Sequence, residues 1–211
     1  MTKKPISGVI LAGGLGRRMG GVDKGLQLLH EKPMVQWVLE RFAPQVDEVW
    51  INANQNAERY ADFGYPLLPD QIQGFAGPLA GLHAALSKAI YPLVATVPCD
   101  SPFLPNDLIA RLAAALEAQP ASHLPQLAVA RTFEQPHPVF CLCPRTALPH
   151  LSAFLESGGR RFEHWYATLD TVEVAFDDEA DAFSNINTRD ELEKLRQGEI
   201  RPPSTKKCSY G

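Results

Sequence analysis

The sequence predicts an α/β fold: a single three-layer domain in which a mostly parallel β-sheet lies between two layers of helices. Short apolar runs rich in β-branched residues alternate with segments whose apolar residues recur at helical spacing, as in parallel strands joined by crossover helices. The 211 residues, 45% of them hydrophobic, are enough to bury one substantial core. No internal repeat or long linker divides the chain, so we expect one domain.

The first half of the chain begins with a strand over residues 6–11, an apolar run that ends abruptly in Ala12-Gly13-Gly14. A helix is expected from Pro33, because the apolar residues after it recur at helical spacing and proline suits a first helical turn. The elements expected next are a strand over 46–53, a helix over 56–63, a strand over 65–68, a glycine-rich segment over 74–81 leading into a helix that ends at 89, a strand over 92–98 and a helix over 107–118.

The second half is less regular. We expect strands over 126–130, 139–142 and 172–176, helices over 146–156 and 161–167, and a last helix from Arg189. Thr188-Arg189-Asp190-Glu191 has the form of a capping box, which supports the start of that last helix. Beyond Gly198 the apolar periodicity is lost. We therefore predict one domain over residues 1–197 and a flexible C-terminal tail over residues 198–211.

Composition and charge argue against several classes of protein. A net charge of -4 provides no basic field for nucleic-acid phosphates. The first apolar stretch breaks at Gly13, too early for a signal peptide or a membrane span, so we expect a cytoplasmic protein that contacts no membrane. Four cysteines are too few for a disulfide framework, and we expect free thiols, with Cys141 and Cys143 packed on one face of a strand.

Other catalytic motifs are missing from the sequence. None of the six histidines has a metal-ligand spacing, and no serine lies in a G-x-S-x-G motif. A histidine-bound metal centre and a serine hydrolase are therefore not expected.

The loop over residues 11–25 is the most informative segment. Its glycines and Lys24 do not have the spacing of a P-loop or of a G-x-G-x-x-G dinucleotide motif. Instead, a strand ends in backbone without side chains, whose amides can approach phosphate oxygens, and the cations Arg17, Arg18 and Lys24 follow. This arrangement suits a triphosphate. The alternative is a surface loop whose cations are simply solvated.

Polar residues also follow the other strands. Asp100 comes directly after the strand over 92–98, where open α/β sheets place their ligands, and a single carboxylate there can bind Mg²⁺ together with phosphates and water. The alternative for Asp100 is an Asx turn before Ser101-Pro102. Asp70 and Asn52 end extended segments in the same way, and each can face the ligand or only shape a turn.

Taken in order, these segments resemble the nucleotidyltransferases with a Rossmann-like core, and specifically the molybdenum cofactor guanylyltransferases of the MobA type. The matching segments, which extend to about residue 197, are Leu11-Ala12-Gly13-Gly14, Arg17-Arg18-Met19-Gly20, Gly20-Gly21-Val22-Asp23-Lys24-Gly25, Asn52-Ala53-Asn54, Gly77-Pro78-Leu79-Ala80-Gly81, Pro98-Cys99-Asp100 and Asn185-Ile186-Asn187-Thr188.

The resemblance implies an enzyme that transfers GMP from GTP to the terminal phosphate of molybdenum-bound molybdopterin and releases pyrophosphate, with Mg²⁺ as cofactor. It implies transient contact with molybdenum insertion proteins and apo-molybdoenzymes. By the same resemblance, Asp100 holds the metal, Asn185 and Asn187 hold molybdopterin, and the residues that bind GTP are Leu11, Ala12, Gly13, Gly14, Lys24, Asn52, Asp70 and Asp100.

The chemistry of such a transfer agrees with these residues. A phosphomonoester is already largely ionised at neutral pH, so no general base is needed, and Arg18, Lys24 and Asp100 with its metal are expected to neutralise charge and align the two anions. Three alternatives remain open at this point: a molybdopterin cytidylyltransferase, a sugar-phosphate nucleotidyltransferase, and a noncatalytic nucleotide-binding protein that delivers the cofactor.

Overall fold

A computed structural model describes residues 4–13, 23–72, 77–184 and 186. Six strands form one sheet in the order β4-β1-β5-β7-β6-β8, in which β7 alone runs antiparallel to its neighbours, and a small hairpin lies apart. The strands are β1 Ile6–Leu11, β4 Glu48–Asn52, β5 Leu93–Pro98, β6 Gln126–Thr132, β7 Gln135–Pro144 and β8 Asp170–Ala175, with β2 Leu28–Leu29 and β3 Lys32–Pro33 in the hairpin. The predicted mostly parallel sheet is confirmed.

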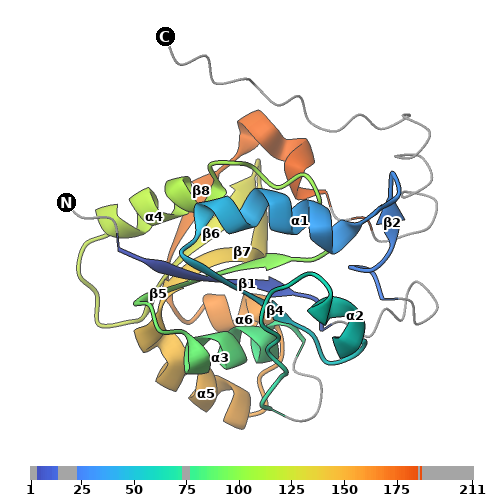
Figure 1. The fold of residues 1–211 in the computed structure, drawn as a ribbon. Helices are drawn as coiled ribbons and strands as arrows, with labels where there is room; N and C mark the ends of the chain where they lie inside the picture. The colour runs from blue at the N-terminus through green and yellow to red at the C-terminus, as the bar shows by residue number, and fades with distance from the viewer. Residues whose placement is uncertain (1–3, 14–22, 73–76, 185, 187–211) are drawn as a thin grey trace.

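Helices cover both faces of this sheet, as predicted, so the domain has three layers (Figure 1). On one face lie α1 Met34–Phe42 and α4 Leu108–Ala118, and on the other lie α3 Pro78–Lys88, α5 Leu148–Glu156 and α6 Phe162–Tyr166. The remaining helical segments are α2 Ala57–Ala61 and the 3₁₀ turns Ala43–Gln45, Arg145–Ala147 and Asp177–Phe183.

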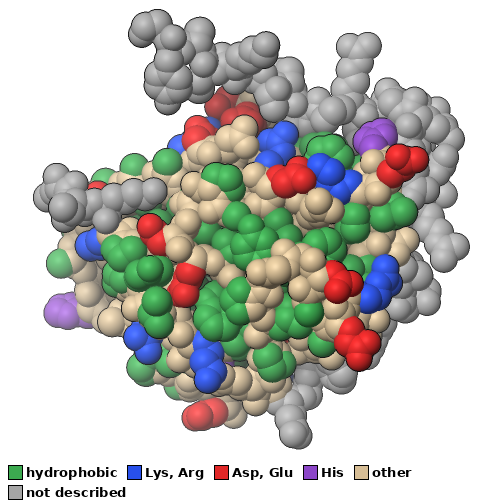
Figure 2. Space-filling model, viewed as in Figure 1, with side chains coloured by type: hydrophobic (Ala, Val, Ile, Leu, Met, Phe, Trp, Pro, Cys, Tyr) green, Lys and Arg blue, Asp and Glu red, His purple; other side chains and the backbone are tan. Residues whose placement is uncertain are grey.

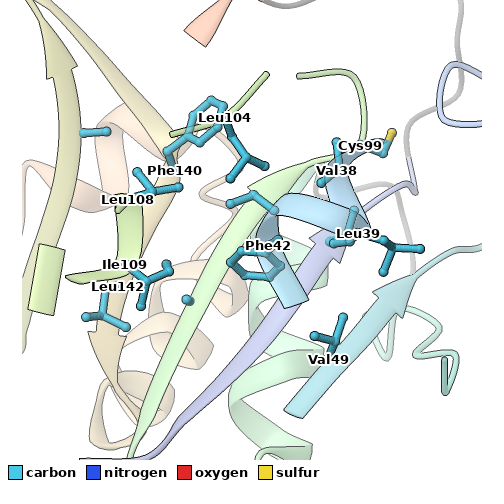
Figure 3. Close-up of a cluster of buried hydrophobic side chains, with 14 of the residues drawn as sticks. Val38, Leu39, Phe42, Val49, Cys99, Leu104, Leu108, Ile109, Phe140 and Leu142 are labelled. Atoms are coloured by element: carbon cyan, nitrogen blue, oxygen red, sulfur yellow. The ribbon is translucent and has the colours of Figure 1, made fainter. Parts of the chain in front are cut away.

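Two hydrophobic cores, one on each face, follow from this layering. All six residues of β1 are buried, because this strand lies in the middle of the sheet with helices on both sides. Figure 3 shows the core between α1, α4 and the sheet, where Phe42 of α1 lies close to side chains from several strands and helices. Cys141 and Cys143 are free, fully buried members of the other core, which confirms that they are packing residues.

The face of the molecule drawn in Figure 2 carries side chains of both charges. Among the described residues on this face, acidic and basic side chains are interspersed. None of the helices in the described part of the chain has the length and apolar character needed to cross a membrane.

The structure differs from the sequence-based prediction in three places. The expected strand over 65–68 makes only one bridge, between Ile51 and Leu67, because Pro66 and Pro69 have no N–H with which to extend the ladder. Strand β7 starts four residues earlier than expected and pairs antiparallel with β6 through a two-residue turn. The hairpin β2–β3 was not predicted. The last helix from Arg189 and the boundary at 197 lie outside the described residues.

Candidate active site

Three adjacent parallel strands end at the same edge of the sheet. Leu11, the last residue of β1, pairs with Asn52 of β4 on one side and with Pro98 of β5 on the other. The backbone continues this register, since the Ala12 N–H donates to the carbonyl of Asn52 over 2.8 Å. A Cβ atom placed on Gly13 would lie 2.6 Å from Asn54 Nδ2. The predicted glycine-ended strand therefore meets the ends of its neighbours, the position where open α/β sheets bind ligands.

An ion pair joins two of the three residues that were predicted to carry the chemistry. Lys24 Nζ lies 2.9 Å from Asp100 Oδ2, although the two are 76 residues apart in the sequence. The Asp100 side chain is 11% exposed and that of Lys24 is 23% exposed, so the pair is shielded but reachable. The pair thus places one cation and one carboxylate at the end of β5.

The thiol of Cys99, next to Asp100, does not act as a charged group in the site. Cys99 is buried, and burial, followed by the negative charge of Asp100, raises the pKa of this thiol well above its usual value. It stays protonated at neutral pH and supplies no thiolate nucleophile.

A second polar cluster follows β4. The carboxylate of Asp70 accepts a hydrogen bond from Asn52 Nδ2 at Oδ1 and one from Asn54 Nδ2 at Oδ2, both over 2.8 Å. The Asp70 N–H donates in return to Asn54 Oδ1, also over 2.8 Å. Sequence reasoning singled out Asn52 and Asp70 but not Asn54 as a site residue. The sequence nevertheless contains a pattern that indicates Asn54. It lies two residues after Asn52, and residues two apart on extended backbone point to the same side.

Gly81 lets α3 approach this cluster closely. A Cβ atom at Gly81 would collide with Asn52 Oδ1 and would lie 2.7 Å from Leu11 Cδ2. The last glycine of the predicted glycine-rich segment thus packs the helix onto Asn52, while residues 73–76 of that segment lie outside the described residues.

A third cluster surrounds Asp23, next to Lys24. Tyr60 Oη donates to Asp23 Oδ1 over 2.6 Å, and Asn56 Nδ2 donates to Asp23 Oδ2 over 2.9 Å. Neither Asn56 nor Tyr60 was singled out from the sequence. No local pattern marks them, because both come from the region of α2, more than 30 residues further along the chain.

Four of the predicted site residues lie outside the described residues: Gly14, Arg18, Asn185 and Asn187. Ile186, between the two asparagines in sequence, is described. Its N–H donates to the carbonyl of Asp100 over 3.0 Å, and its buried side chain packs in a small apolar cluster with Leu29, Met34 and Phe103.

Comparison with known proteins identifies the family of this chain. The family model of the MobA-like NTP transferase domain matches residues 8–172. The molybdenum cofactor guanylyltransferase of Cupriavidus taiwanensis is 50% identical over 197 residues, covering 91% of this chain and 96% of that protein. The protein of the same name from Cupriavidus necator is 51% identical over 197 residues, with the same coverage.

A solved structure shares the fold. The molybdopterin-guanine dinucleotide biosynthesis protein A from Archaeoglobus fulgidus superposes with a TM-score of 0.75 at 24% identity, covering 90% of this chain and 97% of that chain. The sheet, the glycine-ended strand and the relatives at about half identity lead to one conclusion. The chain belongs to the family of MobA-like NTP transferases that includes these molybdenum cofactor guanylyltransferases.

Proposed function

We propose that this nucleotidyltransferase transfers GMP from GTP to the terminal phosphate of molybdenum-bound molybdopterin and releases pyrophosphate, in a reaction that depends on Mg²⁺. The relatives at about 50% identity, named molybdenum cofactor guanylyltransferases, support this choice of substrates. The structural observation that carries the proposal is the Lys24–Asp100 pair beside the glycine-ended strand β1.

In the proposed reaction, a phosphate oxygen of molybdopterin forms a bond to the α-phosphorus of GTP, and the bond from that phosphorus to the β-phosphate oxygen breaks. The attacking phosphate is mostly a dianion at neutral pH, so no side chain has to remove a proton. The difficulty is the repulsion between two anions, which positioned cations reduce. Lys24 supplies one such charge at the strand ends, and Arg18 is proposed to supply another.

Asp100 fits a magnesium ion that draws its other ligands from phosphate and water. Among the described residues, no group of three or more His, Cys, Asp or Glu side chains could hold a metal ion. Magnesium commonly uses one or two carboxylates and completes its octahedron with substrate phosphates and water, so a single strand-end aspartate suffices. When bound, the metal would neutralise phosphate charge. Lys24 Nζ donates to one oxygen of this carboxylate, Asp100 Oδ2, over 2.9 Å.

The cluster around Asp70 supports guanine as the base. A carboxylate only accepts hydrogen bonds, and the Watson–Crick edge of guanine presents two neighbouring donors, N1–H and the N2 amino group. The same edge of cytosine presents one donor, followed by acceptors. Asn52 and Asn54 hold both oxygens of Asp70 in a defined orientation, and each oxygen keeps capacity for a further bond.

The acceptor is proposed to lie on the other side of Asp100. Asn185 and Asn187 are proposed to bind molybdopterin, and the described residue Ile186 donates its N–H to the carbonyl of Asp100. Transient contact with molybdenum insertion proteins and apo-molybdoenzymes, and a cytoplasmic location, belong to the same proposal, because the product has to pass to other proteins.

Calorimetric titration with GTP, CTP and UTP in the presence of Mg²⁺ tests the proposed nucleotide. Selective binding of GTP is expected, whereas preference for CTP or UTP would overturn the guanylyl assignment. Release of pyrophosphate on addition of molybdenum-loaded molybdopterin then tests turnover. If GTP binds and no pyrophosphate forms, the proposed transfer reaction is wrong. That result would favour a noncatalytic nucleotide-binding protein that delivers the cofactor.

A further inference from the structure

The carboxylate of Asp23, the residue just before Lys24, is held by two side chains from the region of α2. Its two oxygens accept from Tyr60 Oη over 2.6 Å and from Asn56 Nδ2 over 2.9 Å. A carboxylate held in this way ties the residue just before Lys24 to a separate helix. We name these three residues, Asp23, Asn56 and Tyr60, the Asp23 clamp.

Both partners on the α2 side are specialised for this contact. Asn56 has a left-handed backbone (φ 52°) just before the helix, and its side chain makes no capping hydrogen bond to the helix, although asparagine is a favoured N-cap residue. It donates to Asp23 instead. Tyr60 is fully buried, and burial, followed by the charge of Cys99 and the hydrogen bond to Asp23, raises the pKa of its hydroxyl. The hydroxyl therefore remains a donor.

The backbone of Gly25, the residue after Lys24, is also held by close contacts. A Cβ atom on Gly25 would lie 2.5 Å from Tyr60 Oη and 3.2 Å from Cys99 Sγ, so the backbone fits between α2 and the end of β5 only as glycine. The Gly25 carbonyl accepts from the N–H of Val35 over 2.9 Å at the start of α1. Lys24 thus sits between two fixed neighbours, one held through its side chain and one through its backbone.

We infer that Asp23 is a positioning residue for nucleotidyl transfer: the Asp23 clamp holds the backbone of Lys24 so that its ammonium group stays at Asp100, where the triphosphate is proposed to bind. This inference rests on the proposed function. Each oxygen of Asp23 accepts a hydrogen bond from the α2 side, which is what a carboxylate that positions its neighbour in the chain requires.

The first test needs no nucleotide. Tyr60→Phe keeps the buried ring and removes only the hydrogen bond to Asp23, and Glu58→Ala, an exposed change on the same helix, is the matched control. Hydrogen exchange of the amides over residues 23–27 should rise about tenfold or more in Tyr60→Phe, since a hydrogen bond to a charged group is lost, and should not change in Glu58→Ala. Equal exchange in Tyr60→Phe and the wild-type protein would overturn the clamp.

The second test asks whether the clamp acts through Lys24. Tyr60→Phe alone should lower kcat/KM for GTP by about tenfold or more, whereas in a Lys24→Ala background it should lower it by less than about twofold, because the group it positions is gone. If Tyr60→Phe lowers kcat/KM by the same factor in both backgrounds, the clamp does not act through Lys24. Tyr60 would then contribute only to general packing. If the wild-type protein transfers no nucleotide, the proposed function fails, and the exchange measurement still decides the clamp.

Discussion

Replacing Gly81 with alanine should weaken nucleotide binding as well as destabilise the fold. The added methyl group would collide with Asn52 Oδ1 and would lie 2.9 Å from Asn52 Cγ and 2.7 Å from Leu11 Cδ2. Asn52 is 3% exposed, and its Nδ2 donates to the Leu68 carbonyl and to Asp70 Oδ1, each over 2.8 Å. The asparagine cannot turn aside without breaking these bonds.

The effect on folding and the effect on GTP binding can be estimated separately. Overpacking of this kind costs about 1–3 kcal/mol, and alanine in a helix interior recovers roughly 0.5–1 kcal/mol relative to glycine, so the free energy of unfolding should fall by about 0–2.5 kcal/mol. The hydrogen bond to the charged Asp70 is worth about 1.5–3 kcal/mol. If Asp70 reads the base, losing its orientation should raise the Kd for GTP by about 10- to 100-fold.

Gly8→Ala is the control for this variant. On β1, its added methyl group would lie 2.7 Å from Phe42 Cε1 and 2.8 Å from Val46 Cγ2, in the core beside α1 and away from Asn52. Urea unfolding should show a loss of stability in both variants, while calorimetric titration with GTP should show weaker binding only in Gly81→Ala. The reasoning is refuted if folded Gly81→Ala binds GTP as tightly as the wild-type protein does, or if Gly8→Ala weakens binding equally.

Three further predictions concern charge. Asp100→Asn keeps the size of the side chain and removes its charge, so magnesium-dependent pyrophosphate release should fall about a hundredfold or more with little change in thermal unfolding; activity close to wild type would exclude Asp100 as the metal ligand. Lys24→Ala should weaken GTP binding about tenfold, measured by calorimetry, and an unchanged affinity would remove Lys24 from the triphosphate site. Burial lowers the pKa of His137, which lies against Phe183 and Thr132, below its ordinary value of 6.5. The unfolded chain therefore takes up this proton first as pH falls below about 6.5, and the unfolding free energy should decrease there. Urea titrations near pH 7 and pH 5.5 should show a smaller decrease in His137→Gln than in the wild-type protein.

Much of the architecture could be read from local patterns. The apolar run of β1 and the helical spacing of α1 depend on residues close in sequence, and both elements are present at the expected positions. Apolar periodicity did not predict the structure correctly where hydrogen bonding between strands decides whether a strand forms. The segment around Leu67 has apolar residues but prolines on either side, and it makes a single bridge. The hairpin β2–β3 was missed because strands of two residues carry no periodicity.

For the candidate site, the sequence by itself determined which residues stand at strand ends: Gly13 after β1, Asn52 at the end of β4 and Asp100 after β5. These positions follow from short-range composition, because an apolar run and the polar or glycine residue that ends it are neighbours in the chain. Only the tertiary structure decided the partnerships, such as Lys24 with Asp100 and Asp23 with Tyr60. Those contacts depend on strand order and on how α2 packs, which result from many long-range contacts acting together and leave no local signal at the residues that meet.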